Sequence, residues 1–335
     1  MKLLNELSQL TNHHKKNCKL YKWYIDTIFT GKKKFKSLEE IPWIPVRAFK
    51  NHELKSVENH EVFKVMQSSG TSGIKSKIFL DKENARAQQI KLIEVFTKRF
   101  GKSRFPMLVI DSEKTIKDSA NFSARTAAIN GFGIFSKFKT FALDDKMKID
   151  EEKLIDFLKK VSGTTFFIFG FTSVIWKFFL KNSKLKKLNF DFSKSFLIHG
   201  GGWKKLENEK VSKGEFKKKI KEVLGCKKIH NYYGMIEQTG SIYLECENGN
   251  LHAPDGSDFI IRSLENFAPL KANQEGLIQL FSNIQTSYPG HSILSEDIGK
   301  FLPLSHCKCG SKKKVLKILG RVKKAEVRGC SDAIN

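Results

Sequence analysis

The sequence has no apolar run long enough to cross a membrane. Its most apolar stretch, residues 164–180, is short and contains Lys177, so it indicates a buried strand followed by a helix. At the N-terminus Leu3 and Leu4 are followed at once by polar residues, so no signal-peptide core forms. We therefore expect a cytoplasmic protein without a membrane span. In that compartment the six cysteines are expected to be reduced thiols rather than a disulfide framework.

Arginine and acidic residues are scarce. Lysine and arginine together number 60 against 35 aspartates and glutamates, and nearly all of this excess of +25 is lysine. Proteins that read nucleic-acid sequence depend on arginine for bidentate contacts, whereas these lysines are spread along the chain as on solvated faces. We therefore expect no nucleic-acid partner. A positive field of this size favours ATP and an acidic protein partner.

Internal repeats and low-complexity segments are also missing. Instead, expected strands and helices alternate up to about residue 240, which is typical of an α/β domain with a mainly parallel sheet. The clearest helix, 82–100, has Asp81 as its cap. Its expected inward face carries Ile90, Ile93 and Phe96. The expected strands of this region are 107–110, 166–169, 195–198 and 228–230. The remainder of the chain is strand-rich.

A loop of small hydroxyls and glycines lies between two strand-like runs, at residues 67–77. Such a loop exposes many backbone N–H groups and can wrap a phosphate chain closely. The spacing of the P-loop of kinases and GTPases is absent. A Ser/Gly-rich turn is equally typical of a plain hairpin, so the loop alone leaves both interpretations open. Its candidate phosphate-binding residues are Ser68, Ser69, Gly70, Thr71, Ser72 and Gly73.

A second segment, residues 231–240, favours the phosphate loop over the plain hairpin. The loop resembles the phosphate loop of acyl-adenylate-forming enzymes, and this segment resembles their Y-G-x-T-E motif. Tyr233, Gly234 and Glu237 match that motif, while Ile236 stands where threonine is usual. This departure and its flanking residues resemble one branch, the acyl-protein synthetase (LuxE-type) family, which is close to phenylacetate–CoA ligases.

Further motifs follow in the order of that family, from about residue 40 to the C-terminus. The glycines after His199 resemble a turn that contacts adenine. Asp297 resembles an aspartate that binds the ribose hydroxyls, and Arg321 lies in what resembles the hinge ending the large domain. The three glycines of the turn are Gly200, Gly201 and Gly202.

The resemblance implies an α/β fold of the adenylate-forming type. We expect a large N-terminal domain with mainly parallel sheets flanked by helices, and a small β-rich subdomain. The mobile C-terminal lid of the wider superfamily is expected to be largely absent. The expected divisions are a helical lead-in at 1–60, a nucleotide-binding core at 61–240, a β-rich subdomain at 241–320, and a hinge and tail at 321–335.

The resemblance also implies MgATP chemistry. A carboxylate is a poor electrophile, so its oxygen attacks the α-phosphorus of ATP and pyrophosphate leaves. Residues 68–73 would bind the β- and γ-phosphates, with either Lys75 or Lys77 reaching them. Glu237 would coordinate Mg²⁺ and Tyr233 would cover the adenine. Asp297 and Arg321 would hold the ribose.

The acyl group must then pass to a thiol. In the resembled family a cysteine near the C-terminus accepts it as a thioester and passes it to a reductase partner, and Cys330 is the matching residue here. Neighbouring cations could lower its pKa. A lone terminal cysteine is also commonly inert, so the acceptor stays open between Cys330, a partner protein such as an acyl carrier protein, and CoA.

A third constellation has the ligand types of a tetrahedral zinc site. It consists of Cys246, His252, Cys307 and Cys309, and the related phenylacetate–CoA ligase-like proteins carry a similar set. His306 could replace His252. Reduced, unliganded cysteines are the alternative.

We therefore interpret the chain as an ATP-dependent acyl-adenylating ligase that activates a carboxylic acid, with a fatty acid as the expected substrate. The nearest alternative is a CoA ligase of the phenylacetate type. An alternative of another class is a non-catalytic nucleotide-binding scaffold that keeps the fold.

Overall fold

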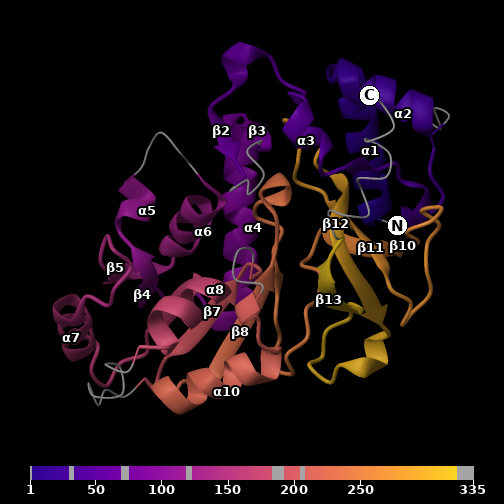
Figure 1. The fold of residues 1–335 in the computed structure, drawn as a ribbon. Helices are drawn as coiled ribbons and strands as arrows, with labels where there is room; N and C mark the ends of the chain where they lie inside the picture. Colours follow the sequence, from indigo (N-terminus) through magenta and orange to yellow (C-terminus); the bar gives the residue numbers. More distant parts are fainter. Residues whose placement is uncertain are drawn as a thin grey trace, which may run out of the picture.

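The computed structural model describes residues 2–29, 34–68, 75–117, 123–182, 192–203 and 208–322. A six-stranded sheet, a five-stranded sheet and a two-stranded hairpin organise these residues. In Figure 1 the six-stranded sheet lies to the lower left and the five-stranded sheet to the right. None of the described helices is long and apolar enough to span a bilayer.

The six-stranded sheet has the order β5-β4-β6-β7-β8-β9. Its first five strands are parallel, and β9 is antiparallel to β8. The expected mainly parallel sheet is therefore confirmed, and parallel strands bring their carboxyl ends to one edge. The strands are β4 (Phe105–Ser112), β5 (Ser136–Leu143), β6 (Phe167–Phe171), β7 (Phe196–Gly200), β8 (Lys228–Tyr233) and β9 (Tyr243–Leu244).

Helices cover both faces of this sheet because its central strands are apolar on both sides. On β4, Leu108 and Ile110 pack into one cluster with α7, η3 and α10, whereas Met107 and Val109 pack into another with α4 and α6. This division follows from the two-residue alternation of a strand. The helices are α4 (Lys82–Phe100), α5 (Lys114–Lys117), α6 (Ala124–Gly133), α7 (Glu151–Lys160), α8 (Thr172–Val174), the π-helical η3 (Ile175–Leu180) and α10 (Lys213–Leu224).

Helix α4 has the expected bounds, but of its expected inward face only Phe96 is buried. Asp81 caps it by accepting a hydrogen bond from the backbone N–H of Asn84. Ile90 and Ile93 are exposed, at 46% and 41% of their surface, so their inward placement was wrong. The buried residues, four apart, are Asn84, Gln88, Leu92 and Phe96. Two polar side chains can occupy that face because both find hydrogen-bond partners there.

The five-stranded sheet contains the order β1-β12-β11-β10, and β13 also pairs with β12. Strand β1 comes from the lead-in and pairs parallel with β12, at Ile44 opposite Ile293. The lead-in therefore contributes a strand to the β-rich part of the chain. The strands are β1 (Ile44–Pro45), β10 (Ser257–Arg262), β11 (Gly276–Ser282), β12 (Ser292–Leu302) and β13 (Val315–Arg321).

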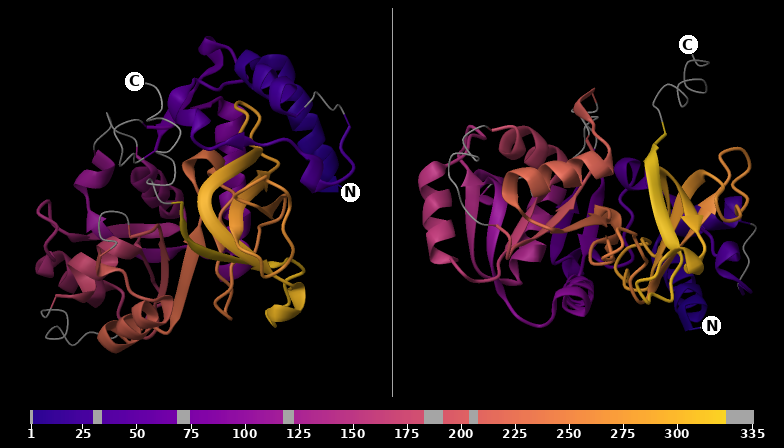
Figure 2. Two further views of the ribbon diagram at one scale, coloured as in Figure 1. Left: turned by 45° about the vertical axis from the view of Figure 1, so that its right-hand side comes forward. Right: turned by 90° about the horizontal axis from the view of Figure 1, so that it is seen from below.

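The N-terminal helices lie against this second sheet (Figure 2). Leu7 of α1 packs with Ile260 of β10 and Phe281 of β11, which fixes the lead-in to the sheet through apolar burial. The lead-in and the connections contain α1 (Lys2–Asn17), α2 (Lys19–Ile28), η1 (Leu38–Glu40), α3 (Ala48–Asn51), η2 (Asn59–Glu61), η5 (Ile236–Gln238) and η6 (Leu304–His306).

A separate antiparallel hairpin carries the expected phosphate loop. It is formed by β2 (Lys64–Gln67) and β3 (Lys77–Leu80), with Gln67 opposite Lys77. Figure 1 shows the hairpin above α4, between the two larger sheets. Residues 69–74 of the loop lie outside the described residues.

Candidate active site

The glycine turn and the tyrosine segment meet at the carboxyl edge of the six-stranded sheet. Strand β7 ends at Gly200, which pairs with Tyr232 of the parallel strand β8. Tyr233 is the last residue of β8. The parallel register therefore brings two of the expected adenine-contacting segments side by side, at the edge where ligands of such sheets bind.

Two residues of the turn have to be glycine. A Cβ on Gly200 would lie 2.4 Å from the Tyr232 ring. Gly201 has φ of +77° and a Cβ there would lie 2.8 Å from the Phe171 ring. Gly202 has no such contact among the described residues, because a Cβ there would meet no atom within 4 Å. The turn is thus set by close packing and by a left-handed backbone.

Tyr233, Asp297 and Arg321 form one chain of contacts. The Tyr233 hydroxyl donates to Asp297 Oδ2 at 2.7 Å, and Arg321 Nε lies 3.3 Å from Asp297 Oδ1. The pairing of β12 with β13 places the second pair directly opposite. Burial raises the pKa of Asp297, against the opposing effects of Tyr233 and Arg321. Three residues singled out by the sequence are therefore brought together.

Two residues that sequence reasoning left without a role extend this chain. Glu296 Oε2 lies 3.3 Å from Arg321, and Glu296 Oε1 lies 2.7 Å from Arg47 Nη2. Arg47 directly precedes α3. Glu296 therefore bridges Arg47 of the lead-in and Arg321 at the end of β13.

Glu237 lies close to the two ends of the phosphate loop. Its side chain is buried, with 5% of the residue exposed. Burial raises the pKa of Glu237, whereas the Ser76 hydroxyl, Lys50 and Arg321 lower it. Ser76 in turn closes the loop: its backbone N–H donates to Ser68 Oγ at 2.9 Å, and its carbonyl accepts from the Ser68 N–H at 3.1 Å.

Of the remaining site residues, six lie outside the described part of the chain, and Lys75, Lys77 and Gly234 lie within it. Ser69, Gly70, Thr71, Ser72, Gly73 and Cys330 lie outside the described residues. Of the two lysines, Lys77 Nζ lies 3.4 Å from Glu53 Oε1 in a half-exposed ion pair, which is a weak interaction that a phosphate can replace. The choice between Lys75 and Lys77 stays open. Gly234 packs closely, since a Cβ there would lie 3.1 Å from Ile242.

The four expected zinc ligands cluster. One donor atom from each of Cys246, His252, Cys307 and Cys309 lies within 4.8 Å of the others. Cys246 and Cys307 sulfurs are 3.6 Å apart, and Cys309 Sγ is 3.4 Å from His252 Nε2. A tetrahedral ion with bonds of about 2.3 Å to sulfur sets its sulfurs about 3.8 Å apart, so the spacing fits zinc.

The surroundings of the cluster orient its members. His252 Nδ1 lies 2.9 Å from the carbonyl oxygen of Lys313. Donation to that carbonyl leaves Nε2 as the ligand atom, which is the usual arrangement of a zinc-binding histidine. Asn250 Nδ2 donates to Cys307 Sγ at 3.2 Å. His306 is exposed and is not part of the cluster, so the structure selects His252.

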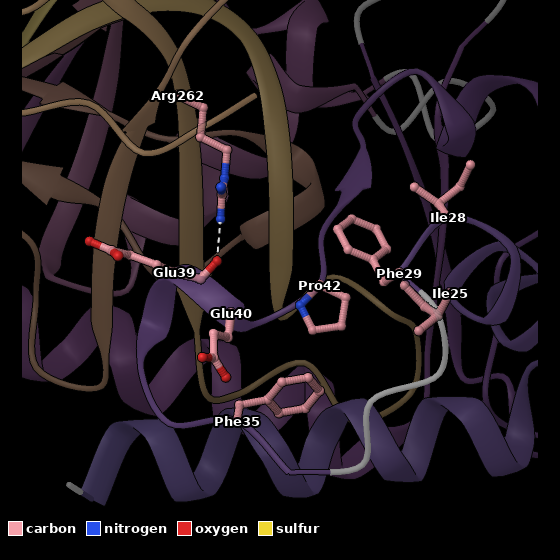
Figure 3. A pocket seen from close by; sticks show the side chains of 8 residues that line it. All are labelled: Ile25, Ile28, Phe29, Phe35, Glu39, Glu40, Pro42 and Arg262. Atoms are coloured by element: carbon pink, nitrogen blue, oxygen red, sulfur yellow. Dashed lines mark hydrogen bonds between the residues drawn. The ribbon is translucent and has the colours of Figure 1, made fainter. Parts of the chain in front are cut away.

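Two cavities lie outside these clusters. One, of about 320 Å³, is lined by residues that follow β4 and β5 and by the start of α6, including Lys114, Arg125 and Asp145. The other, of about 340 Å³, lies among α2, η1 and Arg262 (Figure 3). Arg262 donates there to the carbonyl of Glu39 at 2.8 Å and is otherwise bonded to Gln279 and Phe267. Neither cavity contains an expected nucleotide-binding residue.

Comparison with known proteins identifies the family. The chain matches the family described as "Acyl-protein synthetase, LuxE" over residues 2–335. The chain belongs to this family. It is 22% identical over 294 residues to the long-chain-fatty-acid–luciferin-component ligase of Aliivibrio fischeri, covering 78% of this chain and 70% of that one. It is 22% identical over 370 residues to the Vibrio harveyi ligase of the same name, covering 98% and 88%.

Solved structures show the same fold. An open form of 2-hydroxyisobutyryl-CoA ligase, in complex with 2-HIB-AMP and CoA, matches with a TM-score of 0.75 and 16% identity, covering 96% of this chain and 69% of that chain. ATP-bound MatB from Rhodopseudomonas palustris matches with a TM-score of 0.52 and 16% identity, covering 79% and 49%. The chain thus has the adenylate-forming fold. Its family membership makes it an ATP-dependent acyl-adenylating ligase.

Proposed function

We propose that this acyl-protein synthetase uses MgATP to convert a fatty acid into an acyl adenylate and then transfers the acyl group to a thiol. One observation carries the proposal: the buried Glu237 lies beside Ser76, which closes the phosphate loop. An acidic side chain at the end of such a loop is suited to hold the cation that accompanies a triphosphate. The fatty acid is supported by the names of the two relatives.

Each site residue receives a role. Residues 68–73, with Lys75 or Lys77, bind the β- and γ-phosphates through backbone N–H groups, hydroxyls and an ammonium. Tyr233 and the glycine turn cover the adenine. The Tyr233 hydroxyl also orients Asp297, whose carboxylate accepts hydrogen bonds from the ribose hydroxyls next to Arg321. These contacts position the α-phosphorus for attack by the carboxylate oxygen, and pyrophosphate leaves.

The residues around Glu237 fit a magnesium ion. The carboxylate is buried, and it lies near the Ser76 hydroxyl and its own backbone N–H but is paired with no cation in direct contact among the described residues. Carboxylate oxygens are the ligands that Mg²⁺ prefers. The bound ion would supply positive charge against the phosphate oxygens.

Exchange between ATP and labelled pyrophosphate, measured with a panel of carboxylic acids, tests the adenylation. We expect exchange that depends on a fatty acid and on Mg²⁺. A chain that binds ATP but supports no exchange with any acid would instead be the non-catalytic scaffold.

The acyl acceptor is proposed to be the thiol of Cys330, from which the acyl group passes to an acyl reductase or an acyl carrier protein. The family description supports a protein acceptor, whereas the CoA-bound structural relative supports CoA. Labelled fatty acid and ATP should give a hydroxylamine-labile label on the protein. If Cys330→Ala keeps the full label, Cys330 is not the acceptor, and label found on added CoA would identify a CoA ligase.

We also propose that the cysteine and histidine cluster holds a structural zinc ion, because its spacing and its oriented His252 fit tetrahedral coordination. Zinc would join the connection between β12 and β13 to the segment after β9. Freshly purified protein should contain close to one equivalent of zinc, and less than a tenth of an equivalent would rule the site out.

The division into lead-in, core, β-rich subdomain and tail stays a proposal of the same kind. The use of ATP supports a cytoplasmic location for the reaction.

A further inference from the structure

An irregular segment, residues 284–291, joins β11 to β12 in the interior of the protein. Only Thr286 of this segment is exposed. A buried loop needs partners for its backbone groups, and here they come from several elements. Its carbonyl groups accept from His14 of α1, from Ser56, from Asn84 of α4 and from Gln238 of η5. The segment is therefore a junction between distant parts of the chain.

Ser287 of the junction contacts β3, the strand that follows the phosphate loop. The Ser287 hydroxyl donates to the carbonyl oxygen of Phe79 on β3 at 2.9 Å. Its oxygen also lies 3.0 Å from Asn84 Oδ1, at the start of α4. Strand β3 follows directly after Ser76, so this contact fixes the hairpin arm next to the loop.

Tyr288 and Gly290 of the same segment contact η5 at Glu237 and Gln238. The Tyr288 hydroxyl donates to the carbonyl oxygen of Glu237 at 2.9 Å. Gln238 Nε2 donates to the carbonyl oxygen of Gly290 at 2.8 Å. Gly290 approaches so closely that a Cβ there would lie 2.8 Å from the Glu237 oxygen. These three contacts together fix the position of η5 against residues 288–290.

We propose that Tyr288 is a positioning residue that fixes Glu237 relative to the phosphate loop and thereby sets the geometry of the magnesium site. This inference rests on the proposed function of Glu237. Tyr288 does not act on substrate, since its hydroxyl contacts the main chain of Glu237 and lies 3.4 Å from Gln88 Nε2. Burial raises the pKa of Tyr288, so the phenol keeps its proton and remains a donor.

Tyr288→Phe removes the hydroxyl and keeps the ring that packs against Phe49, with the ring centres 6.1 Å apart. The Glu237 carbonyl then loses its donor, and one of the three contacts that position η5 is removed. We expect the Mg²⁺ concentration needed for half-maximal ATP binding to rise about fivefold, which corresponds to one hydrogen bond. Titration calorimetry of ATP at a series of Mg²⁺ concentrations measures it.

Tyr243→Phe is the matched control. Tyr243 is equally buried, and its hydroxyl donates to the carbonyl oxygen of Asp258 at 2.8 Å, away from Glu237. Both variants lose a buried tyrosine-to-carbonyl hydrogen bond, so their melting temperatures should fall by similar amounts. The Mg²⁺ dependence should change only in Tyr288→Phe.

The outcomes separate this inference from the proposed function. Equal Mg²⁺ dependence in Tyr288→Phe, Tyr243→Phe and the wild-type chain would overturn the positioning role, whatever the exchange assay shows. Wild-type chain that binds MgATP without pyrophosphate exchange would overturn adenylation alone. A wild-type chain that binds no MgATP would overturn both.

Discussion

At the scale of single residues, two aspartates of the chain differ in their surroundings and therefore in their expected roles. Asp297 lies between the Tyr233 hydroxyl and the Arg321 guanidinium and is largely shielded from water. Asp255 makes an exposed ion pair with Lys98 at 2.9 Å. The sequence indicated a role for Asp297 only through the order of the motifs, because a lone aspartate is usually a turn or cap residue.

We expect Asp297→Asn to raise the KM for ATP at least about tenfold, because hydrogen bonds to a charged group contribute about 1.5–3 kcal/mol. Asp255→Asn, which removes a solvated pair, should leave this KM unchanged. Pyrophosphate exchange at varied ATP measures both. An unchanged KM in Asp297→Asn would remove Asp297 from the ribose site.

The glycine turn gives a second prediction at this scale. Gly200→Ala forces a methyl group against the Tyr232 ring at 2.4 Å, and overpacking of this kind costs about 1–3 kcal/mol in the free energy of unfolding. Gly202→Ala meets open space and should leave that free energy within about 0.5 kcal/mol. Urea unfolding of the two variants is the measurement, and equal stability would contradict the packing of the turn.

At the scale of elements, the sequence predicted the kinds and approximate positions of strands and helices but not how each one faces. Helix α4 was placed from its cap to its last residue, yet its inward face was assigned to Ile90 and Ile93 instead of Leu92 and Gln88. The error arose because two buried polar residues interrupt the apolar pattern. Their partners belong to residues 284–291, about 200 positions away, and no local pattern reveals them.

The cluster of three cysteines and His252 shows the same limit and yields a third prediction. Sequence gave the ligand types but left His252 and His306 open, whereas the contact of Leu251 with Leu316 brings His252 alone to the cysteines. His252→Ala should therefore lose most of its zinc and melt at a lower temperature. His306→Ala should keep about one equivalent. Loss of zinc in both variants, or in neither, would contradict the assignment.

At the scale of the whole molecule, four histidines are buried without charge. Burial lowers the pKa of His291 and His199 to about 3, that of His230 to about 4, and that of His14 well below its usual value. His14 and His291 stack with their ring centres 5.0 Å apart and connect α1 to residues 284–291. Their neighbours include His13, Tyr21 and Thr11, with no carboxylate among these contacts to stabilise a proton.

These histidines predict a loss of stability in acid. Above pH 6.5 they are neutral in both the folded and unfolded states. As the pH falls below 6.5, the unfolded chain binds protons that the folded chain accepts only at lower pH, about 4 for His230 and about 3 for His199 and His291, so the free energy of unfolding falls. Each histidine contributes up to about 1.4 kcal/mol per pH unit in this window. Urea unfolding at pH 7, 6 and 5 measures the slope, and His291→Gln should reduce it. A flat profile would contradict neutral burial.

The fold class, the family and the order of the motifs were therefore accessible from the sequence. The pairing of β1 with β12, the ion pairs of Glu296 and the junction at residues 284–291 were not, because each joins residues that are far apart in the chain. Such contacts depend on the completed fold rather than on local propensity. The roles of the site residues stay predictions until they are measured.

The most direct test of the account compares pyrophosphate exchange in the wild-type chain and in Glu237→Gln, with a fatty acid and saturating ATP. If the loop and this carboxylate act on one nucleotide, removing the charge while keeping the shape should lower kcat at least about a hundredfold. It should also abolish the response to added Mg²⁺. Exchange at the wild-type rate, with the wild-type Mg²⁺ response, would contradict the shared site.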